Sequence, residues 1–410
     1  MNTYATVILA ALVLEFVLGL VGNILNLRSL SPALPAEFEG TYDPEKYAES
    51  QTYTRAKTRF SLVESTFSIA VTLAFWYAGG FPWLDSFVRG FEQGPVVTGL
   101  SFMMLLVLGL KLLGLPFQLY STFKLEARFG FNRTESSTFW GDQAKGLVLG
   151  ALLGGVLMAA ILYFFEKTGS SAWLWCWGTT TVFMLGAMFV APTWIMPLFN
   201  QFTPLDDGEL RDKILKYAQS VAFPLEGLFV IDGSKRSTKA NAFFTGFGKN
   251  KRIALFDTLI EAQSEEELVA VVAHEIGHYK RKHIVQSLVI GILHFGALFW
   301  LLSIFIQNQG LFDAFGVAQP SVHAGLIFFG LLFTPIEMVL SVVMSAFSRK
   351  NEFEADEFAA HTTGQPEDLV SALKKLSKDN LSNLTPHRFY VWMHYSHPPV
   401  LARIAALRAL

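Results

Sequence analysis

The residues with the clearest chemical potential lie together in one short segment. His274 and His278 are four positions apart in the sequence HEIGH, and Glu275 stands between them. On an α-helix, residues at i and i+4 lie on one face, so both imidazoles can reach one cation. A zinc ion held by such ligands keeps one position for water and lowers the pKa of that water toward about 7. Glu275 can then accept a proton from the water, so the pattern predicts metal-assisted hydrolysis.

The segment around these residues has the character of a helix. It reads EEELVAVVAHEIGHYKRKH from Glu265 to His283, with acidic residues in the first turn and basic residues in the last. This distribution complements the helix dipole. The alternative is a solvated helix on which the order His-Glu-His is accidental.

A third metal ligand is expected from a second acidic segment. Residues 348–361 read SRKNEFEADEFAAH and also have helical spacing. Glu352 and Asp356 are one turn apart, so one face can present a ligating carboxylate and a second carboxylate that accepts the other N–H of a metal-bound histidine. Spacing alone gives Glu352 only a modest preference over Glu354, and a merely charged helix beside the membrane would show the same pattern.

The composition is that of a membrane protein. Hydrophobic residues make up 52% of the 410 residues and charged residues only 16%. The net charge of −2, without a dense basic stripe, gives no support for a nucleic-acid partner. The single cysteine, Cys176, excludes a thiolate cluster, and all 9 histidines lie beyond residue 273. A metal site therefore needs histidine and carboxylate ligands from the C-terminal part of the chain.

Seven apolar runs are long enough to cross a bilayer as helices of roughly 20 residues. They lie at about 5–27, 60–82, 98–120, 146–166, 172–198, 284–306 and 324–347. Lys and Arg gather in alternate connections, which places the N-terminus outside and the C-terminus in the cytoplasm. Four ionisable residues within these runs indicate either a wet cavity or pairing between helices: Glu15, Lys111, His294 and Glu337.

These elements predict a mostly α, polytopic membrane protein with a metalloprotease domain on the cytoplasmic side. We expect residues 1–199 to form five spans with their loops, and 284–347 to form the last two spans. The stretches 200–283 and 348–410 would together form the metalloprotease domain. Short strands at 228–232, 241–246 and 252–256 predict a small sheet beside the catalytic helix.

The chain also resembles the type I CAAX prenyl proteases, which are integral-membrane zinc metalloproteases. The resemblance covers nearly the whole chain and includes FGFNRT at 129–134, NAFFTGFGKNKRIALFDTLI at 241–260, AHEIGHYKRKH at 273–283, SRKNEFEAD at 348–356 and YSHPPVLARI at 395–404. It implies a ring of seven helices around a water-filled chamber. It also implies one Zn²⁺ per chain, near the cytoplasmic end of that chamber.

The resemblance assigns further roles to individual residues. It implies that Glu352 is the third zinc ligand and that Asp356 supports a zinc-bound histidine. His397 would lie near the zinc, where it could hydrogen-bond the substrate or stabilise an oxyanion, and Arg403 would orient carboxylates or substrate. The edge strand would pair with the substrate and place Asn241 and Ala242 beside the scissile peptide, the alternative being a hairpin that serves only packing.

The remaining histidines have weaker assignments. His283 could support the zinc ligands, but a position at the interfacial end of a helix is at least as plausible. The other five are expected to be structural: His294, His323, His361, His387 and His394.

The expected partners are membrane lipid and a peptide or protein substrate, which is prenylated in eukaryotic family members. The compact chain favours a bacterial inner membrane, with the endoplasmic reticulum membrane as the eukaryotic alternative. Two other interpretations of the sequence stay open: a membrane quality-control protease like the heat-shock metalloproteases, and a transporter or channel with a structural zinc site.

Overall fold

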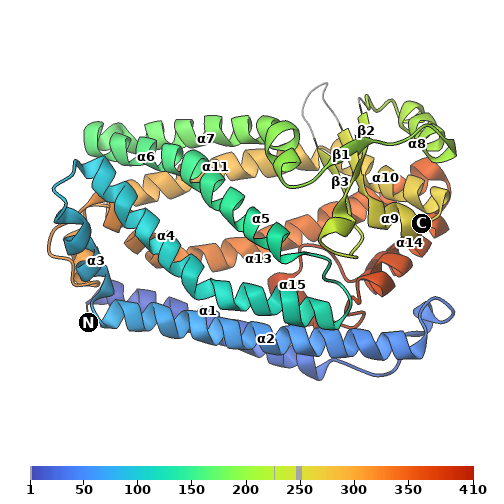
Figure 1. Cartoon of the computed structure of the whole chain (residues 1–410), viewed down its shortest axis with the longest axis horizontal. Helices are drawn as coiled ribbons and strands as arrows, with labels where there is room; N and C mark the ends of the chain where they lie inside the picture. Colours follow the sequence, from blue (N-terminus) through green and yellow to red (C-terminus); the bar gives the residue numbers. More distant parts are fainter. Residues whose placement is uncertain (1, 226, 246–251) are drawn as a thin grey trace.

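The computed structural model describes residues 2–225, 227–245 and 252–410, and seven of its helices are long and apolar enough to span a membrane (Figure 1). The predicted number of spans is therefore confirmed. The spans cover Thr3–Arg28, Pro44–Tyr77, Pro95–Glu126, Ser136–Lys167, Gly169–Leu198, His283–Phe305 and Val322–Thr363. Many of their large apolar side chains are exposed, as a lipid-facing surface requires.

Four of these spans are single α-helices, and three contain π-helical turns. The single helices are α1 (Thr3–Arg28), α2 (Pro44–Tyr77), α11 (His283–Phe305) and α13 (Val322–Thr363). The third span joins α4 (Pro95–Tyr120) to η2 (Ser121–Glu126). The fourth joins α5 (Ser136–Leu149), η3 (Gly150–Gly154) and α6 (Gly155–Lys167). The fifth joins η4 (Gly169–Ser171), α7 (Ala172–Val190), η5 (Ala191–Ile195) and η6 (Met196–Leu198).

The second span ends earlier than the apolar run suggested. We expected a helix to residue 82, but α2 ends at Tyr77 and the chain turns at Gly79, whose φ of 75° suits glycine. A separate helix, α3 (Gly80–Arg89), then begins. Hydropathy did not reveal this break because apolar residues continue on both sides of the turn.

The remaining helices are short and lie mainly at one end of the molecule (Figure 1). They are η1 (Ala36–Phe38), α8 (Glu209–Ser220), η7 (Gly233–Lys235), α9 (Asp257–Ala262), α10 (Glu265–Lys280), α12 (Gln309–Asp313), α14 (Pro366–Asp379), α15 (Arg388–His394) and α16 (Val400–Leu407). The N-terminus lies at the end with α3, whereas the C-terminus lies at the opposite end, beside the sheet and α14.

The expected small sheet is present and has four strands in the order β1-β2-β4-β3. Its strands are β1 (Phe202–Pro204), β2 (Gly227–Ile231), β3 (Ala242–Thr245) and β4 (Arg252–Phe256). β2 and β4 are parallel, while β1 and β3 pair antiparallel at the two edges. β1 was not predicted, since it has three residues and ends in proline. Asn241 lies just before β3 rather than inside it, and Gly246, the expected last residue of that strand, lies outside the described residues.

One hydrophobic core joins the sheet to segments that are distant in sequence. It contains Leu255 from β4, Val272 from α10, Leu373 from α14 and Ile404 from α16. Phe38 and its neighbours between α1 and α2 complete it, so the connection after the first span helps to build this end of the molecule.

The helix α10 carries the HExxH residues and is fixed at its start and along its length. The Ser264 side chain accepts the Glu267 N–H, and the Glu267 side chain accepts the Ser264 N–H, which forms a capping box. Glu267 also accepts hydrogen bonds from Ser371 and Lys375 of α14. Near its other end, Gly277 lets α10 approach α13 closely, because a Cβ there would lie 3.0 Å from the Ala355 carbonyl oxygen.

Candidate active site and metal centre

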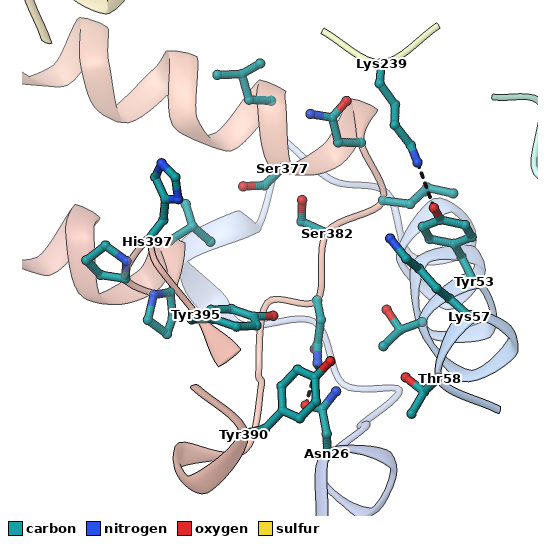
Figure 2. Close-up of a pocket in the computed structure, with 18 of the residues that line it drawn as sticks. Asn26, Tyr53, Lys57, Thr58, Lys239, Ser377, Ser382, Tyr390, Tyr395 and His397 are labelled. Atoms are coloured by element: carbon teal, nitrogen blue, oxygen red, sulfur yellow. Dashed lines mark hydrogen bonds between the residues drawn. The ribbon is translucent and has the colours of Figure 1, made fainter. Parts of the chain in front are cut away.

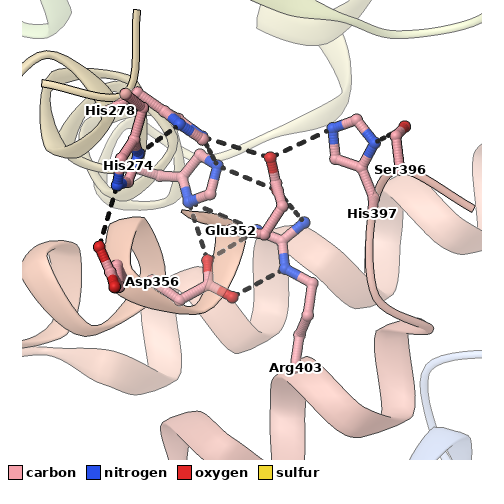
Figure 3. Close-up of polar contacts among 9 residues, drawn as sticks. His274, His278, Glu352, Asp356, Ser396, His397 and Arg403 are labelled. Atoms are coloured by element: carbon pink, nitrogen blue, oxygen red, sulfur yellow. Dashed lines mark hydrogen bonds and ion pairs between the residues drawn. The ribbon is translucent and has the colours of Figure 1, made fainter. Parts of the chain in front are cut away.

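Three potential metal ligands from two helices converge in the structure (Figure 3). His274 and His278 project from α10 and Glu352 from α13, and one ligand atom of each lies within 4.8 Å of the others. The Nε2 atoms of the two histidines are 3.2 Å apart. Glu352 Oε2 lies 3.5 Å from His274 Nε2, and Oε1 lies 3.3 Å from His278 Nε2. The two imidazoles thus face the same carboxylate.

Asp356 and Arg403 support His274 on the Nδ1 side of its ring, which faces away from Glu352. Asp356 Oδ1 lies 2.8 Å from His274 Nδ1, so Nε2 of that ring is left to face Glu352. The guanidinium of Arg403 donates two hydrogen bonds to Asp356, from Nε at 2.8 Å and from Nη2 at 2.6 Å. Asp356 is 1% exposed, and such a buried carboxylate needs a charged partner of this kind.

His278 is held in a corresponding way by His283 and Glu354. His283 Nδ1 lies 3.0 Å from His278 Nδ1, and Glu354 Oε2 lies 3.1 Å from His283 Nε2.

The expectation that one helix continues to His283 is wrong. α10 ends at Lys280, Lys282 takes a left-handed conformation with φ of 61°, and α11 begins at His283. This turn brings His283 back against the HExxH helix, and His283 is buried.

Glu354 was treated above only as an alternative ligand, so its contact with His283 was missed. Two residues along a helix correspond to a rotation of about 200°, which places Glu354 on a different face from Glu352. The sequence signal that could have found this contact is the second acid itself, beside a histidine that directly follows the HExxH segment.

Glu275 and His397 lie beside the ligand cluster. Glu275 lines the same small cavity as His274 and Glu352. Burial raises the pKa of Glu275, the direction that suits a general base near neutral pH. His397 Nε2 lies 3.3 Å from Glu352 Oε1, while Ser396 Oγ lies 3.0 Å from His397 Nδ1. His397 remains exposed on the open side of the cluster.

Asn241 and Ala242 line the cavity of about 210 Å³ that contains His274 and Glu275. Ala242 is the first residue of β3, which pairs with β4 along one side only within the described residues. The Asn241 side-chain oxygen accepts the Ala242 N–H, and this contact shapes the entry to the strand. The start of β3 therefore lies beside the ligand cluster, and a strand edge that is unpaired among the described residues can accept an extended peptide.

The five remaining histidines make contacts away from this cluster. His323 lies 2.7 Å from Asp85, His294 lies 3.5 Å from Glu337 and His361 lies 3.8 Å from Glu357. The other two, His387 and His394, serve as the N-cap of α15 and as a ring neighbour of Tyr390.

The polar atoms of the cluster fit a bound cation. Glu352 is 4% exposed, yet its Oε2 atom has no hydrogen-bond partner among the described residues. The nitrogen atoms that face it, His274 Nε2 and Arg403 Nη1, both lie at 3.5 Å, so a cation held closer would complete the surroundings of this buried carboxylate oxygen. Two imidazoles and one carboxylate form a donor set of the kind that holds catalytic zinc.

Comparison with known proteins gives matches along nearly the entire chain. Residues 23–201 match the family model described as CAAX prenyl protease N-terminal, five membrane helices, and residues 204–410 match Peptidase family M48. The chain is 37% identical to CAAX prenyl protease 1 homolog of Oryza sativa subsp. japonica, across 98% of this chain and 97% of that relative. It is 34% identical to the Homo sapiens CAAX prenyl protease 1 homolog, across 92% and 89% of the two chains.

The solved structures include a protein with the same fold. The crystal structure of Ste24p from S. mikatae superposes with a TM-score of 0.94 at 34% identity and covers 99% of both chains. The resemblance drawn from the sequence motifs is therefore confirmed, and the matches favour a protease over a transporter with a structural metal site. The chain belongs to peptidase family M48 and is an integral-membrane metalloprotease of the CAAX prenyl protease type.

Proposed function

We propose that the chain is a zinc-dependent endopeptidase in which His274, His278 and Glu352 hold one zinc ion. The observation that carries this proposal is the convergence of their ligand atoms within 4.8 Å. The contact between Asp356 and His274 Nδ1 supports it, because it orients Nε2 toward the other ligands. When bound there, zinc supplies the Lewis acidity that makes water nucleophilic near neutral pH.

The protein groups around the ligands provide proton transfer and charge stabilisation. Glu275 accepts the proton of the attacking water and delivers it to the departing amine. Burial raises the pKa of the Glu275 carboxyl, which brings it closer to the pKa values of the groups that exchange protons with it, the attacking water and the departing amine. His397, exposed beside Glu352, donates a hydrogen bond to the oxygen that becomes negative during attack. Arg403 keeps Asp356 in position and adds positive charge close to Glu352, at 3.5 Å.

The substrate in this proposal is an extended segment of a membrane-associated protein. Asn241 and Ala242 at the free edge of β3 bind its backbone, and the scissile peptide then lies beside Glu275. The relatives are named CAAX prenyl proteases, which supports a prenylated protein as substrate. The apolar surface of the seven spans places such a substrate and the enzyme in the same lipid phase.

The proposed orientation places the ligand cluster on the cytoplasmic side and the N-terminus outside. The support is the asymmetry of Lys and Arg between alternate loops. Residues 200–283 and 348–410 then act as one metalloprotease domain and residues 1–199 and 284–347 as the membrane domain. Reporter fusions after Arg28 and after Leu410 test this orientation, and it is wrong if the fusion at Arg28 reports an external location.

The zinc-protease mechanism is tested by replacing Glu275 with glutamine. We expect Glu275→Gln to retain one zinc per chain and to lose about 10²- to 10⁴-fold in the rate of peptide cleavage, because the base is removed while the ligands remain. Metal content is measured by elemental analysis, and cleavage with a farnesylated CAAX-type peptide. Glu266→Gln is the matched control, since Glu266 is an exposed acid of the same helix. Cleavage at the parental rate by Glu275→Gln would disprove the mechanism.

A further inference from the structure

A second, larger cavity adjoins the ligand cluster. It has a volume of about 700 Å³ and shares Asn380, His397 and Arg403 with the small cavity around His274. We call it the polar cavity, after the polar residues that line much of it. Those shown in Figure 2 include Asn26, Tyr53, Lys57, Thr58, Tyr390 and His397. A cavity of this volume holds a drug-sized molecule, which corresponds to a short peptide segment.

The charged residues of the polar cavity all have the same sign. Lys57, Lys239 and Arg403 line it, whereas no Asp or Glu is among the described residues that do. Arg403 is neutralised by Asp356, and Lys239 Nζ lies 2.8 Å from Glu126. Lys57 has no carboxylate within ion-pair distance in the described part of the chain. Lys57 is solvent-exposed, so the wall formed by α2 presents to the cavity one positive charge that no carboxylate of the described residues pairs with.

The neighbours of Lys57 strengthen this imbalance. Lys239 donates a hydrogen bond to Tyr53, at 2.7 Å, and the Lys57 ammonium lies 5.8 Å from the centre of the Tyr53 ring. Two ammonium groups therefore lie close to one tyrosine, and only the Lys239 group is paired with a carboxylate. Burial lowers the pKa of Lys239, and the charge of Lys57 acts in the same direction. A further anion in the cavity would relieve this repulsion.

We propose that the polar cavity binds the C-terminal carboxylate of the substrate, with the Lys57 ammonium as its ion partner. The inference rests on the proposed function. A peptide segment leaving the zinc centre through the shared residues enters the polar cavity, whose volume accommodates a short stretch of chain. The cationic lining favours a segment that ends in a carboxylate over one that ends in an N-terminal ammonium. Figure 2 shows Lys57 on one wall of the cavity and His397 on the other.

The inference makes Lys57 a determinant of specificity for cleavage near a free C-terminus. The experiment uses one CAAX-type peptide in four forms: the free acid, the C-terminal amide, the amide with a glutamate as its last residue, and the free acid lengthened by several residues. Each is cleaved by the zinc-loaded parent chain, Lys57→Met and Lys57→Arg. Arg59→Gln is the matched control, because Arg59 lies on the same helix, forms no ion pair with any described residue and does not line the cavity.

We expect the parent chain to prefer the free acid over the amide by roughly tenfold or more in kcat/KM, the effect of one charge-assisted hydrogen bond. Lys57→Met should lose most of this preference, Lys57→Arg should keep much of it, and Arg59→Gln should keep all of it. The lengthened peptide should be cleaved as poorly as the amide. If the glutamate restores cleavage of the amide to the level of the free acid, a side-chain carboxylate is what binds, and the proposal for the C-terminus is overturned.

A failure of this inference differs from a failure of the proposed function. Equal cleavage of the acid and the amide by the parent chain overturns the role of the polar cavity but leaves the protease intact. A loss of the same size for both peptides in Lys57→Met also overturns it, because a carboxylate contact predicts a selective loss. If no form is cleaved, the proposed function fails. Binding of acid and amide to the zinc-loaded Glu275→Gln chain then decides the inference, which requires tighter binding of the acid.

Discussion

Replacing Asp356 with asparagine tests how the metal centre is organised. The carboxylate of Asp356 lies 2.8 Å from His274 Nδ1 and accepts two hydrogen bonds from Arg403. Asparagine has the same shape but no negative charge, so it weakens the hydrogen bond to His274 and leaves the largely buried Arg403 guanidinium without its closest counter-charge. Removal of such a supporting carboxylate typically lowers metal affinity by about 10- to 100-fold.

That loss corresponds to about 1.4 to 2.7 kcal/mol of zinc binding free energy. The assay is a competition titration of zinc between the purified chain and a chelator of known affinity. Glu357→Gln is the control, because Glu357 follows Asp356 on α13 but is half-exposed and, among the described residues, forms ion pairs with Arg281 and His361 rather than with the ligand cluster. An Asp356→Asn chain whose zinc affinity equals that of the parent would refute the argument that Asp356 orients His274.

Three further predictions concern the pH dependence of metal binding and the packing of α10. Burial lowers the pKa of His274, but the hydrogen bonds to Asp356 and Glu352 outweigh this effect and raise the pKa to about 9 in the metal-free chain. Zinc must displace the proton from His274 in order to bind. Zinc titrations at different pH values should therefore show an apparent zinc affinity that rises with pH until about pH 9 and then levels off. Ser264→Ala removes the capping box and should destabilise the chain by about 1 kcal/mol, seen as a lower Tm in detergent. Gly277→Ala places a Cβ 3.0 Å from the Ala355 carbonyl oxygen, so it should lower the free energy of unfolding by about 1 to 3 kcal/mol and weaken zinc binding. Gly291→Ala is the control, because the nearest neighbour of its Cβ lies at 3.9 Å, and it should change neither quantity.

Much of the architecture follows from patterns that depend on few neighbours. Each apolar run is long enough to specify a span by itself, and the number of spans was predicted correctly. The positions of His274 and His278 on one helical face follow from the period of the helix alone. Strands β2 and β4 were likewise found within a residue at each end.

Other features depend on tertiary contacts that spacing does not encode. Spacing could not decide between Glu352 and Glu354, because either acid can face α10 until the rotation of α13 is known. The turn at Lys282 was missed, since a left-handed conformation at a residue other than glycine has no clear sequence signature. Its consequence, the contact between His283 and His278, was therefore left undecided. The break at Gly79 was missed because the apolar character continues through it.

The continuity of α13 links the bilayer to the chemistry. Its 42 residues run unbroken from Val322 in the membrane part to Glu352 and beyond. At 1.5 Å per residue the helix is about 63 Å long, roughly twice the thickness of the hydrocarbon core. Pro335 lies inside this helix and removes one backbone hydrogen bond, and Glu352 lies 17 residues beyond it. A tilt of one degree about Pro335 would therefore shift Glu352 by about 0.4 Å. Bilayer thickness, which helices accommodate by tilting, thereby becomes a variable that can tune the distance between Glu352 and the two imidazoles.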